Sequence, residues 1–436
     1  MRIQLPKDVD YIIKELQKNG YEAYAVGGCV RDVILGREPE DWDITTSASP
    51  IQVKGIFKRT IDTGIIHGTV TVMLDKNGYE VTTYRIDGEY EDNRHPREVT
   101  YTPYLSEDLM RRDFTINAMA YNEDSGLVDI FEGLKDLEEQ RIRCVGSAEM
   151  RFEEDALRIL RAVRFSAQLG FEIDKGTLNA AEIKAENLKN ISAERIRTEL
   201  NKLLLSPNPD RLRTAWELGI TAIILPEFNV LMTKPHNSGE QKEPYGAFSL
   251  RSIRLLKERV LSSAKGKEKE SSILSWALLL QGLTPEEGRE VLRRLKFDNE
   301  TIDYVYRLLT WCDYEFLLTP WEMRKAVNAI GKDLMDMLFF VKEASILTES
   351  GSISGGKGEG LNTARELYHE ILSKKECVEL KELMINGKDL IELGFKPGKI
   401  MGQVLGELLV FVLKEPELNT KEKLSLMAEE IFLKRS

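Results

Sequence analysis

Hydrophobic and polar positions alternate along the first third of the chain in a way that predicts short strands. From Tyr24 to about Cys144, β-branched runs such as YAVGG, DWDITT, GTVTVML, YEVTTYRI and LVDIF are separated by Gly, Asn and Asp. A helix is expected before them, because Ile12 and Leu16 stand at helical spacing and Gly20 follows as a C-terminal cap. The pattern predicts a small α/β domain.

Beyond Glu149 the strand signals end, and apolar residues recur three and four positions apart, which predicts amphipathic helices. The helical segments include EDALRILRAVRFSAQLG, SAERIRTELNKLL, DRLRTAWELG, PEEGREVLRRLKF and DNETIDYVYRLLTW. A segment rich in Gly and Ser, 350–362, interrupts them. The predicted class is α+β, an α/β head followed by an elongated all-helical arm. We expect four parts, with the boundaries 1–145, 146–208, 209–349 and 350–436.

Length and charge narrow the class of protein. A chain of 436 residues exceeds one ordinary domain, and its formal net charge is −11. A molecule of this charge does not attract nucleic acid over its whole surface. Any RNA site must therefore be a local basic surface.

The cysteines and the lack of long apolar runs predict a cytoplasmic protein without membrane association. The four cysteines are scattered without CxxC spacing, which argues against a disulfide framework or a zinc knuckle. No stretch approaches the roughly 18–20 apolar residues that a membrane span requires. A reducing cytosol fits both observations.

The segment 26–50, VGGCVRDVILGREPEDWDITTSASP, contains the most informative motif. Two glycines end a predicted strand and a helix-like run follows, so backbone N–H groups converge where a phosphate could bind; Gly28 and Arg31 belong to this group. Asp41 and Asp43 follow at positions i and i+2 of a predicted strand, which directs both carboxylates to one face. Two convergent carboxylates suit Mg²⁺, which also takes substrate phosphates as ligands.

Each half of this motif, seen alone, is more often a simple turn or a solvated strand end. Together they are more specific. The glycines do not form the GxGxxG pattern of a dinucleotide-binding fold, and the chain has no GxxxxGK[ST] phosphate loop.

The motif resembles the signature GGxVRDxLLGxxxxDxD of class II tRNA nucleotidyltransferases and bacterial poly(A) polymerases, relatives of DNA polymerase β. Here it reads GGCVRDVILGREPEDWD. The resemblance implies a polymerase β-like head in which Asp41 and Asp43 are the catalytic metal ligands and Gly28 and Arg31 contact the triphosphate. Glu80, on a predicted neighbouring strand, is a candidate third metal ligand, although a plain surface position is equally compatible with its pattern.

A second block, LMRRDFTINAMAYN, matches the family motif RRDFTINAMA. The resemblance implies that Arg112 contacts the nucleotide phosphates, and that Asp113 and Asn117 shape a ribose pocket. A carboxylate and an amide are suited to a 2′-hydroxyl, which both donates and accepts hydrogen bonds. The apolar spacing around this charged cluster indicates that the segment is packed.

A third block, EEDALRILRAVRFSAQLGF, would by itself suggest an exposed, salt-bridged helix. Asp155 and Arg158 stand at i and i+3 and are expected on one helix face, with Arg161 and Arg164 continuing the row. The family carries EDxxR here as an amino-acid template for the incoming base, and Glu154 completes the match. The resemblance adds nucleotide contacts for Arg161 and Arg164. A weaker block, ISAERIRTELNKLL, is expected to brace this helix.

The resemblance weakens toward the C-terminus. Many relatives carry a His-Asp phosphohydrolase site, but Gln281 and Gly282 stand at the comparable position and His236 is isolated in the sequence. We therefore expect no phosphohydrolase activity. The segment 385–409 resembles the family's tail, which holds the tRNA elbow, and its Gly394 suits a tight turn between helices.

The predicted function is untemplated addition of CCA to the tRNA 3′ end from CTP and ATP, with release of pyrophosphate. Poly(A) polymerases share all three blocks but usually extend into a long basic C-terminus, whereas this chain ends in EIFLKRS. An enzyme that adds only A is an alternative, and the full-length segment from Asp87 to Leu109 indicates that the A-adding step is retained. A catalytically dead tRNA-binding protein would be expected to lack an aspartate of DxD, and both are present. The sequence does not predict an oligomeric state.

Overall fold

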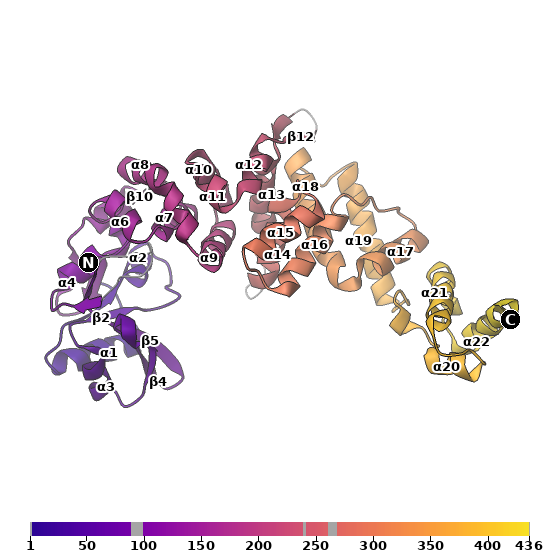
Figure 1. Ribbon diagram of the computed structural model, residues 1–436, viewed down its shortest axis with the longest axis horizontal. Coiled ribbons are helices and arrows are strands. Elements are labelled where there is room, and N and C mark those ends of the chain that lie inside the picture. The colour runs from indigo at the N-terminus through magenta and orange to yellow at the C-terminus, as the bar shows by residue number, and fades with distance from the viewer. Residues whose placement is uncertain (1, 89–98, 239–240, 260–267, 436) are drawn as a thin grey trace. The chain divides into compact units, whose positions relative to one another are not determined.

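The structure is a computed structural model, and the chain divides in it into two compact units, Met1–Val230 and Leu231–Ser436 (Figure 1). The residues that the structure describes are 2–88, 99–238, 241–259 and 268–435. Each unit is described by itself below. The four predicted parts remain a prediction, and the first two of them lie within the first unit.

The first unit contains a mixed seven-stranded sheet with the strand order β3-β4-β5-β2-β1-β8-β9. The strands are β1 (Ala23–Val26), β2 (Ile44–Thr46), β3 (Thr60–Gly64), β4 (Thr69–Leu74), β5 (Asn77–Thr83), β8 (Met119–Asn122) and β9 (Gly126–Asp129). Strand β2 pairs antiparallel with β1 and parallel with β5. The segments that follow β1, β2 and β5 therefore come from strands that are neighbours in one sheet.

The centre of this sheet is buried, and part of it was not predicted. Every residue of β1 and of β8 is buried, and the two strands pair antiparallel. The sequence indicated only that the RRDFTINAMA segment is packed. Strand β8 has only four residues, which are too few to distinguish a strand from a buried turn by pattern. The small head predicted from the alternating pattern is confirmed, with β8 as an additional inner strand.

Helices complete the first unit. Those before and within the head are α1 (Lys7–Lys18), α2 (Gly28–Ile34), α3 (Pro50–Ile56), α4 (Leu105–Met110) and α5 (Gly133–Glu138). Those after the head are α6 (Ala148–Glu154), α7 (Leu157–Leu169), α8 (Lys175–Lys184), α9 (Ala193–Leu204), α10 (Leu212–Glu217), α11 (Ile220–Ile224) and α12 (Pro226–Thr233), whose last residues belong to the second unit. Helix α7 packs against α9, so two helices separated in the chain by β11 (Glu172–Ile173) and α8 are neighbours in space.

The second unit is mostly helical, as predicted. Its helices are α13 (Tyr245–Arg259), α14 (Glu268–Leu280), α15 (Pro285–Arg294), α16 (Asn299–Trp311), α17 (Pro320–Ile330), α18 (Lys332–Ser350), α19 (Lys357–Ser373), α20 (Gly387–Glu392), α21 (Lys399–Lys414) and α22 (Lys421–Arg435). The prediction that strands end after Glu149 is wrong in detail. A short strand, β11 (Glu172–Ile173), pairs with β10 (Arg141–Ile142), and β12 (Pro235–Ser238) pairs with β13 (Gln241–Pro244).

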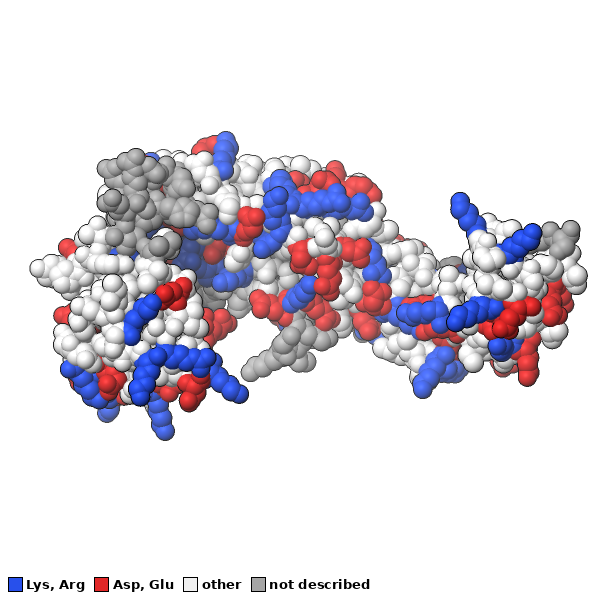
Figure 2. All heavy atoms as spheres, turned by 60° about the horizontal axis from the view of Figure 1, so that its bottom comes forward, with Lys and Arg blue, Asp and Glu red and all other residues white. Residues whose placement is uncertain are grey.

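The surface carries both signs of charge. Lys and Arg side chains are interspersed with Asp and Glu over the face shown in Figure 2, although the net charge of the chain is −11. A helix long and apolar enough to cross a membrane is not found among the described residues.

Candidate active site

A glycine turn joins the buried strand β1 to helix α2. Gly27 has φ +85°, and a Cβ at this position would stand 2.9 Å from Nη1 of Arg112. The Gly27 N–H donates to the carbonyl of Met119 on β8, and α2 begins at Gly28. The backbone approaches Arg112 so closely here that a side chain has no space, which is a positional reason for glycine.

The two aspartates of DxD lie immediately before β2. The prediction that Asp41 and Asp43 are part of the strand is wrong, because β2 begins at Ile44. The backbone hydrogen bonding between β1 and β2 nevertheless extends to Asp43, whose carbonyl accepts a 3.0 Å hydrogen bond from the N–H of Val26. The aspartate pair is therefore held directly beside the end of β1, where the glycine turn begins.

A cavity of about 190 Å³ opens beside Asp43. Its other lining residues are Val26, Ile44, Thr69, Glu80, Thr82, Arg85, Arg111 and Arg112. Glu80 lies on β5, which is the parallel neighbour of β2. The structure thus brings the candidate third carboxylate into the same cavity as Asp43.

The carboxylates of this cavity repel one another. Asp43 is open to solvent as a residue, yet the cavity walls partly desolvate its carboxyl group, and this raises its pKa; Asp41 raises it further, against the opposing effect of Arg112. The pKa of Glu80 is raised by desolvation and then by Asp43 and Asp41. A divalent cation would relieve this repulsion. No group of three or more His, Cys, Asp or Glu among the described residues has the arrangement of a metal site.

Asp108 is a site residue that sequence analysis missed. Its side chain is fully buried, binds Arg111 at 2.8 Å and Arg112 at 3.3 Å, and accepts a 3.1 Å hydrogen bond from Thr45 of β2. Burial opposes ionisation of Asp108, but the two guanidinium groups outweigh it and lower the pKa. One carboxylate on α4 thus joins strand β2 to both arginines of the cavity. Its position in a charged run, SEDLMRRD, gave no signal that it is buried.

A chain of hydrogen bonds connects four of the predicted site residues. Arg31 donates from Nη1 to Oδ1 of Asn117 at 2.6 Å, and Nδ2 of Asn117 donates to Asp113 at 3.1 Å. Asp113 also accepts from Arg161 at 2.6 and 2.8 Å. Burial opposes ionisation of Asp113, but Arg161 and Asn117 lower its pKa and keep it charged. Three sequence blocks therefore meet in one polar network.

Arg161 and Arg164 of α7 both lie near the buried carboxylate of Glu199. Nε of Arg164 donates to Glu199 of α9 at 2.5 Å, and Arg161 lies 3.9 Å from the same side chain. The Arg164 guanidinium also stacks 3.7 Å from the ring centroid of Phe165. Arg164 is buried, so its contacts are with the protein interior. The Arg161 side chain, by contrast, is partly exposed to solvent and donates to Asp113.

The expectation that Asp155 and Arg158 share one helix face is wrong. Helix α6 ends at Glu154 and α7 begins at Leu157, so Asp155 lies at the break between them, with φ −139° and ψ 102°. Its carboxylate accepts the N–H of Leu157 at 3.1 Å, as a helix-initiating Asp commonly does. The spacing i, i+3 was read as continuous helix, although Asp is also a frequent N-terminal cap.

Asp155 and Arg158 have different partners. Arg195 of α9 binds both oxygens of Asp155, at 2.7 and 3.2 Å. Arg158 donates to Glu154 at 2.6 Å and to the carbonyl of Arg111 at 2.9 Å. The contact with Arg111 joins the third sequence block to the second. Arg195 lies in the block expected only to brace the helix, so its direct contact with Asp155 was missed.

Part of one expected feature lies outside the described residues. Of the segment from Asp87 to Leu109, residues 89–98 are not described. Asp87 ends β6 (Arg85–Asp87), and β7 (Val99–Tyr101) pairs with it antiparallel.

The chain is similar to known proteins along most of its length. Family models match the poly A polymerase head domain at 23–143, the probable RNA and SrmB-binding site of polymerase A at 170–232, and tRNA nucleotidyltransferase domain 2 at 268–428. The CCA-adding enzyme of Pediococcus pentosaceus is 37% identical over 427 residues, covering 97% of this chain and 96% of that enzyme. That of Lactiplantibacillus plantarum is 36% identical, covering 95% and 93%.

Solved structures show the same likeness. The CCA-adding enzyme of Bacillus stearothermophilus in complex with CTP is 33% identical, with a TM-score of 0.77 and 99% of each chain covered. The Thermotoga maritima CCA-adding enzyme complexed with tRNA, 22% identical and with a TM-score of 0.62, shares the fold. Enzymes of this family use divalent metal ions. The chain belongs to the CCA-adding enzymes, a family of tRNA nucleotidyltransferases.

Proposed function

We propose that this protein adds C, C and A in turn to the 3′ end of tRNA, using CTP and ATP and no nucleic-acid template. The observation that carries the proposal is the position of Asp41 and Asp43 beside the Gly27–Gly28 turn, with Glu80 and Arg112 at the same cavity. In each cycle the 3′-hydroxyl of the RNA attacks the α-phosphorus of the nucleotide, and pyrophosphate leaves.

The carboxylates fit Mg²⁺ by their chemistry. Asp41, Asp43 and, as a third candidate, Glu80 supply hard oxygen ligands, and their mutual repulsion favours a cation among them. When bound, Mg²⁺ would lower the pKa of the attacking hydroxyl and neutralise charge on the departing pyrophosphate. The two-carboxylate set of DxD leaves positions for the oxygens of the substrates, which agrees with a site completed only by substrate.

The phosphates would be held by the turn and the arginines. Gly28 begins α2, so the unpaired backbone N–H groups of its first turn are available to an anion. Arg112 stands over the turn, and Asp108 fixes its guanidinium. Arg31 contributes less directly, because its side chain is buried and is already bonded to Asn117 and Asp32.

The ribose would meet Asp113 and Asn117. Asn117 is buried and orders both the arginine and the aspartate beside it, so a sugar placed here would contact a rigid network. A 2′-hydroxyl can donate to the charged Asp113 carboxylate and accept from the amide. Arg161 keeps that carboxylate ionised and oriented.

The base would be selected by Asp155 and Arg158. Cytosine and adenine each place an amino donor next to a ring acceptor, whereas uracil and guanine reverse the order. A carboxylate beside a guanidinium matches the first pair. Three hydrogen bonds occupy the Asp155 carboxylate, and a carboxylate has about four acceptor sites, so one remains for an amino group. The pair does not separate C from A.

The remaining parts have proposed roles as well. We assign catalysis to the head (1–145), base recognition to the neck (146–208) and tRNA binding to the tail (350–436), with the body (209–349) between them and without phosphohydrolase activity. The tail contains the expected turn between α20 and α21, with Gly394 at φ +94°. A cytoplasmic location fits the four cysteines, all of which are free thiols.

The names of the relatives favour CCA addition over poly(A) synthesis. The decisive experiment supplies purified protein with tRNA ending before CCA, after C or after CC, and with CTP and ATP separately. CCA addition requires C incorporation on the first two substrates and one A on the third. Extension of only the third substrate would indicate an A-adding enzyme, a long A tail would indicate a poly(A) polymerase, and binding without extension would indicate an inactive protein.

The assignment of the aspartates is tested with Asp41→Ala and Asp43→Ala. Both should abolish addition and leave tRNA binding nearly intact, because the carboxylates serve the metal and not the RNA. Turnover by either variant above about a tenth of the wild-type rate would contradict the assignment, since loss of a metal ligand costs several kcal/mol of transition-state stabilisation.

A further inference from the structure

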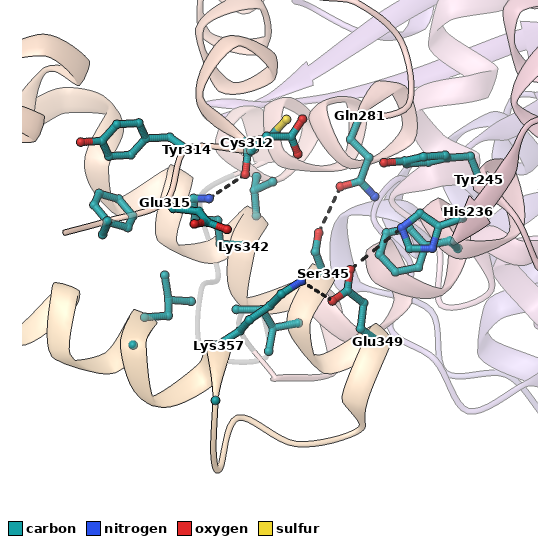
Figure 3. A pocket seen from close by; sticks show the side chains of 18 residues that line it. His236, Tyr245, Gln281, Cys312, Tyr314, Glu315, Lys342, Ser345, Glu349 and Lys357 are labelled. Atoms are coloured by element: carbon teal, nitrogen blue, oxygen red, sulfur yellow. Dashed lines mark hydrogen bonds and ion pairs between the residues drawn. The ribbon is translucent and has the colours of Figure 1, made fainter. Parts of the chain in front are cut away.

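A second cavity, of about 620 Å³, lies wholly within the second unit. Its volume is within the range of small-molecule sites. Its walls come from β12, α13, the end of α14, the segment after α16, α18 and the start of α19 (Figure 3). None of its lining residues belongs to the active site described above. His236 and Gln281, which are separate in sequence, both line it.

One side of the cavity is aromatic. His236 stacks on Phe248 with ring centroids 3.8 Å apart, and Tyr245 meets His236 edge-on at 4.5 Å. Tyr314 and Phe316, whose centroids lie 5.4 Å apart, line the cavity from the segment after α16 (Figure 3). Aromatic walls of this kind favour a flat ligand, because stacking and edge contacts both depend on a planar partner.

One end of an amide in the cavity wall is unpaired. Oε1 of Gln281 accepts a 3.1 Å hydrogen bond from Ser345, whereas its Nε2 atom is buried and has no hydrogen-bond partner among the residues that the structure describes. In Figure 3 this nitrogen points toward the space beside Tyr245 and His236. Exchanging the nitrogen and oxygen leaves the other end of the amide unpaired, so in either orientation a small rotation of the Gln281 side chain toward the cavity would offer a ligand one hydrogen-bonding group. A buried polar group without a hydrogen bond destabilises the folded protein.

The charges that line the cavity are nearly balanced. Glu349 lies between Nε2 of His236, at 4.0 Å, and Nζ of Lys357, at 3.3 Å. Lys342 donates to the carbonyl of Cys312 at 2.6 Å, and Asp313 and Glu315 also line the wall. A simple anion or cation gains little in such surroundings. A ring with both donors and acceptors can satisfy the amide, the hydroxyls and the charged groups together.

From these walls we infer that the cavity binds the base of a nucleoside or nucleotide, with the ring beside His236 and Tyr245 and its polar edge on Gln281. The base could belong to a free nucleotide or to an unstacked position of an RNA. Either source provides the same flat, hydrogen-bonding ring. The inference goes beyond nucleotide addition, because the cavity shares no residue with the catalytic site.

Photolabelling of the full-length protein tests the inference. The protein is irradiated with 8-azido-AMP, and separately with a tRNA transcript that contains 4-thiouridine, and labelled peptides are identified by mass spectrometry. The expected labels lie on peptides that contain Tyr245 or Tyr314. The variant Ser345→Phe places a ring in the cavity and should remove these labels.

The matched control is Asp336→Phe, which adds the same ring to an exposed position of α18, nine residues earlier and on the opposite side of the helix. It should leave labelling unchanged. In addition, Gln281→Leu should reduce labelling at low nucleotide concentration about tenfold, the equivalent of one lost hydrogen bond.

The two probes distinguish the sources of the base. Cavity labels from 8-azido-AMP support a free nucleotide, and cavity labels from the transcript alone support an RNA base. Labels confined to the head, or cavity labels that persist in Ser345→Phe, would overturn the inference while leaving the proposed addition reaction untouched. An unchanged far-ultraviolet circular dichroism spectrum shows that each variant is folded, because the substitutions lie in the mostly helical second unit.

Discussion

Arg195 of α9 donates two hydrogen bonds to the carboxylate of Asp155, and its donor nitrogens lie 2.7 and 3.2 Å from the two carboxylate oxygens. The carboxylate proposed to read the incoming base is therefore oriented by α9, and the adjacent Arg158 is held separately by Glu154. The two members of the proposed template owe their positions to different partners. Each can be disturbed without removing the other.

Substitution of Arg195 should weaken base selection. In Arg195→Met, Asp155 loses its orienting partner, so use of CTP and ATP should fall by about 10- to 100-fold, as expected for a lost hydrogen bond to a charged group. Asp155→Ala should do the same and also narrow the gap to UTP and GTP. Both are measured as kcat/KM for single additions with each of the four nucleotides.

A second arginine of the first unit provides the control. Arg211 pairs with Glu172 and is not part of the proposed site, so Arg211→Met should retain wild-type selectivity. If Asp155→Ala keeps full discrimination against UTP and GTP, the template assignment is wrong and the ion pair of Asp155 with Arg195 only joins the start of α7 to α9.

The effect of the close approach between Gly27 and Arg112 can be tested by comparing Gly27 with Gly20. Gly27 and Gly20 have nearly equal φ angles, +85° and +84°, but a Cβ on Gly20 meets nothing within 4 Å. Gly20→Ala should destabilise the protein by about 1–2 kcal/mol, the cost of a positive φ for a residue with a side chain. Gly27→Ala should destabilise it by more, because its ψ of −128° lies outside the left-handed helical region and its Cβ meets Arg112. Only Gly27→Ala should displace Arg112 and impair nucleotide addition. Equal activity of the two variants in single-turnover assays would show that the contact is unimportant.

Asn117 should control the choice of sugar. Asn117→Ala breaks the hydrogen bonds to Arg31 and Asp113, so the ratio of CTP to dCTP use should fall by about tenfold, the effect of one lost hydrogen bond. Asn122→Ala is the control, because Asn122 is also a buried amide of the head but bonds to the carbonyl of Ala23. An unchanged sugar preference in Asn117→Ala would refute the ribose assignment.

Lys257 of α13 should make stability depend on pH in the alkaline range. Burial lowers its pKa from 10.5 to about 7. Between these values the unfolded chain binds more protons than the folded chain, so this residue makes stability rise with pH. Lys257→Met should therefore raise the melting temperature at pH 7 and below, by about 2–4 °C for each kcal/mol gained. The gain should shrink to zero near pH 10.5.

Thermal unfolding from pH 6 to 10 measures this difference. Lys374→Met is the control, because Lys374 is mostly exposed and pairs with Glu370 on the same helix turn. Its effect should be small and should not shrink across the same range. A melting difference for Lys257→Met that is independent of pH would show that the ammonium is not the cause.

The sequence predicted the catalytic elements because they depend on local patterns. Two glycines after an apolar run and a DxD before β-branched residues are visible without knowing the fold. Asp108 and Arg195 were not identified, because their importance comes from contacts with Thr45 and Asp155, residues distant along the chain. Local spacing also misled at Asp155 itself, where a residue that can cap a helix was taken as part of its interior.

The backbone bond from Val26 to Asp43 has a consequence for the order of addition. It joins the segment that carries the proposed metal-binding carboxylates to the strand that presents the glycine turn, so these two groups are held in one arrangement. Such an arrangement performs the same displacement every time. The count of two cytidines and one adenosine must therefore be kept by something that changes as the RNA end lengthens.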